Sequence, residues 1–263
     1  MLKDLLDINK DIHYKQRLLE ESLNKNQLIP RLREEVATIP DINKFINTDN
    51  KDIYLDILAQ MALYKRATVP TLVGLIYNPS RKLETILNCL KELAENDFLD
   101  CQLNNNNSYM VIVKYVVDYN TQRELDMYCY PVPLLLEPET ITNSNKNGYH
   151  YTYKGSVVLQ HKTNKDINLD VINISNKIRY CINTSVLNNL KNTWNLPKGL
   201  LGRFESALND LSKIYLSNNN TFYLTNKYDF RGRLYCQGYH FTTQGNDYQK
   251  AMLEFADKEV LVD

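Results

Sequence analysis

Two arginines flank a glycine in the segment DFRGRLY, which begins at Asp229. If the segment forms a strand, Arg231, Arg233 and Tyr235 lie on one face, because the side chains of a strand alternate between its two faces. The planar guanidinium of arginine is always charged and binds phosphate through paired hydrogen bonds. Gly232 lacks a side chain, which allows a sugar-phosphate backbone to approach closely. The pattern therefore predicts contact with the backbone of a nucleic acid.

A polar turn that begins at Gln244 follows this segment, and a helical pattern starts after it. Gly245 tolerates a positive φ, and the side chain of Asn246 can cap the helix. We expect the helix to cover residues 247–257, with Lys250 facing away from its apolar side. That apolar side consists of Tyr248, Met252 and Phe255.

The same side chains also have a purely structural interpretation. Arginines on a strand often lie at a solvated edge or form ion pairs, and Asp229 and Asp247 are carboxylates close to them in sequence. Lys250 lies four residues before Glu254, a spacing that favours an ion pair on a helix. Spacing alone therefore leaves phosphate binding and surface ion pairing as alternatives.

The charge of the chain is balanced. Its 263 residues, enough for one large domain or two small ones, contain 31 Lys and Arg residues and 31 Asp and Glu residues. A free-standing, non-specific DNA-binding protein usually has an excess of basic residues. A nucleic-acid site in this chain must therefore be local, or be completed by a partner chain.

Cysteine and histidine are spaced too irregularly for a disulfide framework or a zinc site, since no CxxC motif and no metal-ligand spacing occurs. The residues are Cys89, Cys101, Cys129, Cys181, Cys236, His13, His150, His161 and His240. We expect reduced thiols in a cytosolic protein. No apolar run is long enough to span a bilayer, and the charged start of the chain does not resemble a signal peptide.

The first half of the chain is predicted to be mainly helical. Amphipathic helices are expected over residues 1–37, interrupted near Pro30, and over 53–67 and 69–77. Ser80 can cap the next helix. The buried stripe of that helix is expected to consist of Leu83, Leu87, Leu90 and Leu93.

Two apolar runs, at residues 98–103 and 109–117, flank a polar segment with four asparagines. They are expected to form a β-hairpin near 97–117. Three helices followed by a hairpin resemble a winged helix. A small helical packing unit with a surface hairpin is the alternative.

The second half is expected to combine loops, strands and helices. Residues 130–160 are rich in proline at first, then loop-like and finally strand-like. One long helix is expected over 167–194 and another over 196–216, ended by the asparagines 218–220. The buried stripe of the long helix would consist of Ile174, Ile178, Ile182, Val186 and Leu190. Residues 221–224 return to an extended structure.

The residues singled out above resemble the single-subunit DNA-directed RNA polymerases of T-odd phages and mitochondria. That family carries an Asp-x-x-Gly-Arg element, a tyrosine two residues later, a polar turn ending in Gly-Asn-Asp or a variant of it, and a helix with a basic residue. The matching residues are Asp229, Gly232, Arg233, Tyr235, Gln244 to Asp247, and Lys250. An upstream segment resembles the family through Ile172, Asn173, Tyr180, Ile182 and Asn183. Tyr180 stands where the family usually has tryptophan.

The resemblance implies an α+β, mainly α fold. Residues 1–126 would form a helical, winged-helix-like N-terminal module with the β-hairpin near 97–117. Residues 127–263 would form a short helical thumb and the first strands and helix of a right-hand polymerase palm, which continues on a partner chain.

The resemblance also implies a polymerase that is split between two chains. In the family, the aspartates that hold Mg²⁺ lie downstream of the polar turn, so a second subunit with the palm and fingers would carry them. A two-subunit member occurs among N-four-like phages, and the size and break point of this chain resemble its small subunit. The expected partners are that second subunit, template DNA, the RNA–DNA hybrid and a phage accessory factor for promoter access, in the cytoplasm of the infected bacterial host.

The nucleic-acid contacts that the resemblance implies are made by Asp229, Arg231, Gly232, Arg233, Tyr235, Gln244, Asn246 and Lys250. No residue of this chain is expected to be catalytic or to bind metal. The alternative function is a winged-helix DNA-binding regulator without catalysis. The helix after Ser80 carries three glutamates among three basic residues, which is a poor surface for reading a DNA groove. A degenerate polymerase remnant with a structural role is a third alternative.

Overall fold

The computed structural model describes residues 2–21, 25–104, 107–128, 130–152, 155–159, 166–190, 192, 194–195 and 197–258. The chain forms two compact units: one is Lys25–Leu125, and the other combines Met1–Asn24 with Asp126–Asp263. Both units combine helices with small antiparallel sheets, so the expected α+β class is confirmed at this level. The functional division into residues 1–126 and 127–263 stays a prediction.

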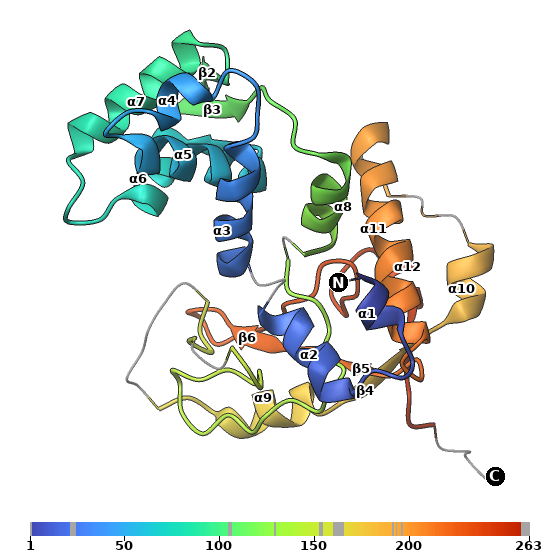
Figure 1. The fold of residues 1–263 in the computed structure, drawn as a ribbon. Helices are drawn as coiled ribbons and strands as arrows, with labels where there is room; N and C mark the ends of the chain where they lie inside the picture. The colour runs from blue at the N-terminus through green and yellow to red at the C-terminus, as the bar shows by residue number, and fades with distance from the viewer. Residues whose placement is uncertain are drawn as a thin grey trace, which may run out of the picture. The chain divides into compact units, whose positions relative to one another are not determined.

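The unit of residues 25–125 packs helices against a three-stranded sheet (Figure 1). The helices are α3 (Lys25–Val36), α4 (Asn43–Ile46), α5 (Lys51–Tyr64), α6 (Val69–Ile76), α7 (Leu83–Glu95) and the first part of α8 (Tyr119–Tyr128). The strands are β1 (Arg66–Thr68), β2 (Leu99–Leu103) and β3 (Tyr109–Val113), in the order β1-β3-β2. The predicted hairpin is confirmed, since β2 pairs with β3. Asn105 and Asn106 of its turn lie outside the described residues.

Helix α7 differs from the prediction in its start and in its buried face. It begins at Leu83 without a side-chain cap, and the Ser80 hydroxyl bonds to Asn78 instead. Leu83 is 51% exposed and Leu87 is 40% exposed. The buried face consists of Ile86, Cys89, Leu90 and Leu93. The apolar arc of this helix is wider than one stripe, and its packing against α5 and β2 determines which side is buried.

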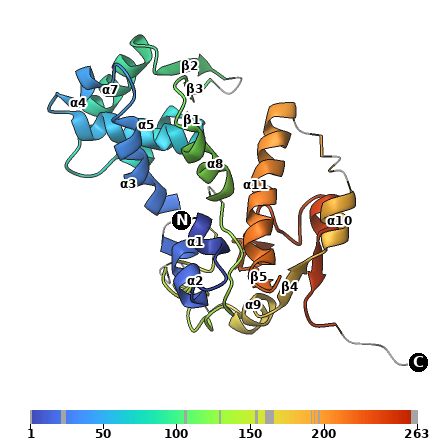
Figure 2. The same ribbon diagram turned by 45° about the vertical axis from the view of Figure 1, so that its right-hand side comes forward.

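The other unit contains six helices among its described residues, and Figure 2 labels five of them, α1, α2, α9, α10 and α11. They are α1 (Leu2–Leu6), α2 (Ile12–Glu21), α9 (Leu169–Asn176), α10 (Thr184–Asn189), α11 (Lys198–Leu216) and α12 (Asp247–Ala251). One antiparallel sheet has the order β5-β4-β8, with β5 (Phe222–Tyr223), β4 (Arg179–Ile182) and β8 (Leu253–Phe255). A separate hairpin is formed by β6 (Asn226–Tyr228) and β7 (Leu234–Cys236). The predicted helix ended by asparagines is confirmed as α11.

The predicted long helix over 167–194 is wrong. Within the described part of that range, α9 ends at Asn176, β4 follows, and Asn183 then caps α10 by accepting a hydrogen bond of 3.0 Å from the backbone N–H of Val186. β4 pairs with β5 on one side and with β8 on the other. Ile174 is 68% exposed and Leu190 is 55% exposed, so the predicted stripe is not continuous. An apolar residue at every fourth position fits a strand as well as a helix, because four is a multiple of two.

The strand-like part of 130–160 is also wrong where the structure describes it. Residues 130–152 and 155–159 form isolated bridges and no strand, among them Leu134↔Tyr223 and Val158↔Tyr228. Helix α2 holds this loop through buried polar side chains. Glu20 accepts hydrogen bonds of 2.7 to 3.0 Å from the backbone N–H groups of residues 150–152. Gln16 accepts one of 2.7 Å from Leu135.

The described cysteines are free thiols: Cys89, Cys101, Cys181 and Cys236. Cys129 and His161 lie outside the described residues. In the described part of the chain, no helix has both the length and the apolar character that crossing a membrane requires.

Candidate nucleic-acid interface

A tight loop joins β6 to β7 and carries the Asp-x-x-Gly-Arg element. The carbonyl of Asp229 accepts a hydrogen bond of 3.0 Å from Gly232, and the N–H of Asp229 donates one of 2.9 Å to the carbonyl of Arg233. Gly232 has a φ of 81°, a conformation that glycine adopts without strain. This is the three-residue hairpin loop in which a turn is followed by a left-handed glycine. The backbone conformation of the loop therefore favours glycine at position 232. This is a second reason for the glycine, beside the close approach of a sugar-phosphate backbone that the sequence predicted.

The predicted strand is shorter than expected. β7 begins at Leu234, so Arg231 and Gly232 lie in the turn and do not share an alternating strand face with Tyr235. Tyr228 belongs to a buried apolar cluster of this unit, and its cross-strand partner Leu234 is partly buried and packs against that cluster. Tyr235, at the next position, therefore lies on the opposite face of the hairpin.

The Asp229 carboxylate organises the loop. Its Oδ1 accepts hydrogen bonds of 2.9 Å from the backbone N–H groups of Arg231 and Arg233, and its Oδ2 accepts one of 2.7 Å from Arg233 Nε. Desolvation raises the pKa of Asp229, but the hydrogen bonds from Arg233 and Arg231 outweigh it and hold the pKa below its usual value. The ion pair with Asp229 is the structural alternative that the sequence left open for Arg233.

Both arginines keep exposed guanidinium groups. The side chain of Arg233 is 59% exposed despite its ion pair, and its guanidinium carbon lies 5.5 Å from the ring centroid of Tyr235. The guanidinium of Arg231 lies 5.1 Å from the ring of Phe230, which is 71% exposed. These groups can therefore still meet a ligand from solvent.

Gln244 attaches the following loop to the hairpin. Its side-chain oxygen accepts a hydrogen bond of 3.0 Å from the N–H of Cys236, and its amide nitrogen donates one of 2.9 Å to the carbonyl of Leu234. These bonds satisfy backbone groups of β7 that no strand pairs with. In this structure Gln244 thus has a structural role, beside the nucleic-acid role that the resemblance implies.

The start of α12 is built as a capping box. Asn246 accepts a hydrogen bond of 2.9 Å from the N–H of Gln249, and Gln249 accepts one of 3.0 Å from the N–H of Asn246. The predicted cap is confirmed. Gly245 does not use its tolerance of a positive φ. Its role is to leave space, because a Cβ there would lie 2.3 Å from the side-chain oxygen of Gln249.

Helix α12 is shorter than predicted. It ends at Ala251, and the chain continues as β8, which pairs with β4. Met252 is fully buried and Phe255 is 61% exposed, so the two do not share one apolar helix face with Tyr248. Lys250 pairs with Asp247 at 3.1 Å, not with Glu254.

The structure thus joins most of the predicted residues into one hairpin–loop–helix unit, residues 226–251. Gln249 completes it by donating a hydrogen bond of 2.5 Å to the carbonyl of Tyr239. Lys250 belongs to this unit through α12, where within the described residues its ammonium pairs with Asp247 and forms no hydrogen bond or ion pair with the hairpin. Sequence reasoning missed Lys227, which lies directly opposite Tyr235 in the pairing of β6 with β7. Two signals could have identified it: the three-residue length of the loop between β6 and β7, which sets the strand register, and the alternation of side chains along β7.

No magnesium site is formed by the described residues, in which no group of three or more His, Cys, Asp or Glu side chains could hold a metal ion. The expected binding of Mg²⁺ by a partner chain stays a prediction.

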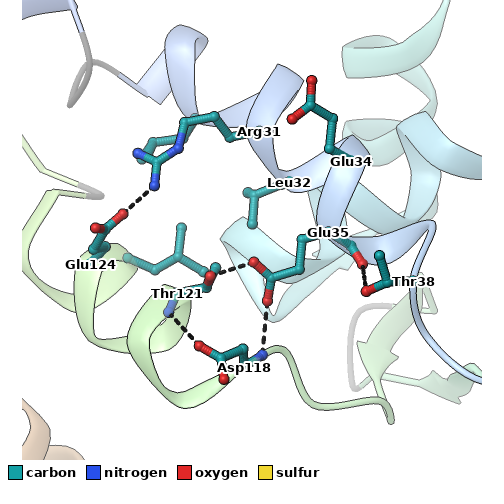
Figure 3. Close-up of a pocket in the computed structure, with 10 residues that line it drawn as sticks. Arg31, Leu32, Glu34, Glu35, Thr38, Asp118, Thr121 and Glu124 are labelled. Carbon is teal, nitrogen blue, oxygen red and sulfur yellow. Dashed lines mark hydrogen bonds and ion pairs between the residues drawn. The ribbon is translucent and has the colours of Figure 1, made fainter. Parts of the chain in front are cut away.

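A cavity of about 500 Å³ in the unit of residues 25–125 is a poor site for nucleic acid (Figure 3). Its polar lining is mainly acidic, with Glu34, Glu35, Asp118 and Glu124 beside Arg31. Arg31 pairs with Glu124, and Glu35 accepts hydrogen bonds from the N–H of Asp118 and the hydroxyl of Thr121. Such a lining repels phosphate.

No protein-family model matches the chain. The chain is similar to a curated protein described as a probable DNA-directed RNA polymerase, from Gelasinospora sp. (strain G114). The two are 25% identical over 181 residues, which make up 65% of this chain and 21% of the relative. The match thus spans about a fifth of the length of that polymerase, and it shows a polymerase-like relationship.

Proposed function

We propose that this chain is the non-catalytic part of a split DNA-directed RNA polymerase, and that it contacts template DNA or the RNA–DNA hybrid through the hairpin–loop–helix unit. The observation that carries the proposal is that the polymerase-like residues form a single hydrogen-bonded unit with exposed guanidinium groups. The similarity to a probable DNA-directed RNA polymerase supports it. Guanidinium groups on a preformed hairpin suit the binding of a phosphate backbone.

The catalytic half belongs to a second chain in this proposal. Two-metal phosphoryl transfer needs carboxylates that hold Mg²⁺ against the incoming triphosphate. A second subunit with palm and fingers would supply them, in the cytoplasm of an infected bacterium, as in the small-subunit arrangement of N-four-like phages. A phage accessory factor would assist promoter access.

The test is reconstitution. This chain is co-expressed with the product of the neighbouring reading frame that carries palm-like sequence, and incorporation of radiolabelled nucleotide is measured on single-stranded and duplex templates. We expect the two proteins to co-purify and to synthesise RNA only together. Separate elution of the two proteins at micromolar concentration would contradict the split-enzyme proposal.

The β2–β3 hairpin supports a second nucleic-acid contact in the same proposal. Its last pair, Leu103 and Tyr109, is 59% and 57% exposed. An exposed apolar pair at the end of a hairpin suits insertion between bases, and the polymerases that the chain resembles use a hairpin in this position to separate DNA strands.

A winged-helix DNA-binding regulator is the second candidate. The order α5, β1, α6, α7, β2, β3 with the sheet order β1-β3-β2 favours it. The exposed surface of α7 argues against it, because Leu83 and Leu87 are exposed and Lys91 pairs with Glu95 at 3.6 Å. The test measures whether the full chain binds duplex DNA with a sequence preference. Loss of this binding in the double variant Lys82→Ala/Lys91→Ala, but not in Arg233→Ala, would favour the regulator.

A further inference from the structure

Lys227 lies on the same face of the β6–β7 hairpin as Tyr235. The two are cross-strand partners, and directly opposed side chains of an antiparallel pair point to the same side. The guanidinium of Arg233 reaches the ring of Tyr235 at 5.5 Å, so it adjoins this face as well. The other face of the hairpin is buried through Tyr228 and Leu234.

The charges on this face are not equally compensated. Arg233 is neutralised by the carboxylate of Asp229 at 2.7 Å. Lys227 is half-buried, and within the described residues its ammonium has no hydrogen bond or ion pair. Burial accordingly lowers the pKa of Lys227.

A half-buried ammonium without a counter-charge is unfavourable. A lysine side chain is long and flexible, and it normally extends its charge into water while its stem covers apolar surface. A methionine or leucine at this position would avoid the desolvation of a charge. The arrangement is therefore best explained by an anion that binds beside Tyr235.

We propose that Lys227 binds a backbone phosphate of the nucleic acid that lies on the Tyr235 face of the hairpin. The inference rests on the proposed function, which places nucleic acid against this hairpin, and adds a residue that the family resemblance did not indicate. A lysine provides a point charge without a fixed fork, which suits a phosphate whose orientation varies along the strand. The contact carries no base information, so it strengthens binding independently of sequence.

The experiment measures binding of the full chain to a short RNA–DNA hybrid at several salt concentrations. Lys227→Met removes the charge and keeps an unbranched apolar stem, and Lys227→Arg keeps the charge. Lys213→Gln is the matched control, because Lys213 is an exposed lysine of the same unit that pairs with Asp210 at 3.6 Å. Lys227→Met is expected to bind about ten-fold more weakly, with a salt slope reduced by about one, while Lys227→Arg and Lys213→Gln keep the wild-type slope.

The outcomes separate this inference from the proposed function. If wild type binds the hybrid with strong salt dependence and Lys227→Met binds equally well, the role of Lys227 is wrong and the proposed function stands. If wild type does not bind the hybrid, both are wrong.

A second experiment with ATP distinguishes the source of the phosphate. A loss of ATP binding in Lys227→Met with unchanged hybrid binding overturns the assignment to a nucleic-acid backbone. A lower melting temperature of Lys227→Met with unchanged binding indicates a structural role only and also overturns it.

Discussion

The spacing of the Asp-x-x-Gly-Arg element has a physical explanation at the level of single residues. The carboxylate of Asp229 binds the backbone of the loop and the guanidinium of Arg233 at once, which requires the glycine between them to have a positive φ. Arg233 is thus held in place by Asp229 and still 59% exposed. An ion pair of this kind preorganises an arginine for a ligand, and it does not decide between a structural role and a binding role.

Replacement of Arg233 separates the two roles. Arg233→Ala is expected to slow RNA synthesis by the assembled two-chain enzyme by about ten-fold or more, because a charge-assisted contact contributes roughly 1.5–3 kcal/mol. Arg233→Lys should restore only part of the rate, since a point charge does not reproduce the planar fork. Asp229→Asn is the control: its Oδ1 can still accept both backbone hydrogen bonds, while the ion pair is lost. Equal melting temperatures and normal synthesis in both variants would contradict a role of Arg233 in binding.

His240 makes the stability of the chain depend on pH. It is 4% exposed and stacks on Phe204 with ring centroids 5.1 Å apart, and burial lowers its pKa to about 4, against the smaller opposing effect of Asp126. The unfolded chain binds the proton more readily, so this contribution is fully present above about pH 6.5 and is lost as the pH falls toward 4. His240→Phe should remove it. Thermal melting between pH 4.5 and pH 7.5 is expected to show a smaller pH dependence for the variant than for wild type, and parallel curves would contradict the assignment.

Gly245 meets a steric requirement that the sequence did not reveal, and its replacement by alanine tests it. Gly245 does not adopt the positive φ that glycine tolerates, but a Cβ at this position would lie 2.3 Å from the side-chain oxygen of Gln249 and disturb the capping box. Gly245→Ala is expected to lower the free energy of unfolding by about 1–3 kcal/mol. Gly202→Ala is the matched control, because Gly202 lies in α11 with open space around its Cα, and alanine there should stabilise by up to about 1 kcal/mol. Equal effects of the two changes in denaturant unfolding would contradict this account.

At the scale of elements, the sequence predicted helices and strands correctly where the residues of one short segment determine its structure. The hairpin of β2 and β3, the helix α11 and the cap at Asn246 all carry their signals within a few residues. The helix over 167–194 failed because β4 is a strand only through its partners β5 and β8, of which the second lies more than 70 residues away. Tertiary pairing overrides local periodicity in such short segments. The same limit explains why Lys227 was missed, since its relation to Tyr235 depends on strand register.

The end of the β2–β3 hairpin carries a prediction at this scale. Leu103→Asn and Tyr109→Asn remove the exposed apolar pair without changing the core of the sheet, where Val111 is fully buried. If the pair inserts between bases, transcription from duplex templates should fall several-fold, while synthesis on single-stranded templates stays near wild type. The ratio of the two rates in the reconstituted enzyme measures this effect. Equal losses on both templates would contradict strand separation by the hairpin.

At the scale of the whole molecule, the division into units was not readable from neighbouring residues. Residues 1–24 belong to the same unit as 126–263, because α2 holds the loop around residues 130–152 through Gln16 and Glu20. Buried polar side chains that bind distant backbone groups leave no periodic trace in the sequence. The polymerase-like motif, in contrast, was visible because a few conspicuous residues lie close together in the chain. The sequence thus predicted which residues form the motif better than it predicted which distant segments pack together.

The proposal of a split enzyme makes its strongest prediction for the purified chain alone. It should incorporate no radiolabelled nucleotide at any Mg²⁺ concentration, since the proposal assigns the aspartates that hold the metal ions of phosphoryl transfer to a second chain. It should still bind an RNA–DNA hybrid, with an affinity that decreases steeply as salt increases, because the exposed arginines and Lys227 would act on the phosphate backbone. Addition of the chain with palm and fingers should restore synthesis, and substitution of an aspartate in that second chain should abolish it. Template-dependent incorporation by this chain alone, after removal of any co-purifying protein, would contradict the assignment of catalysis to a partner.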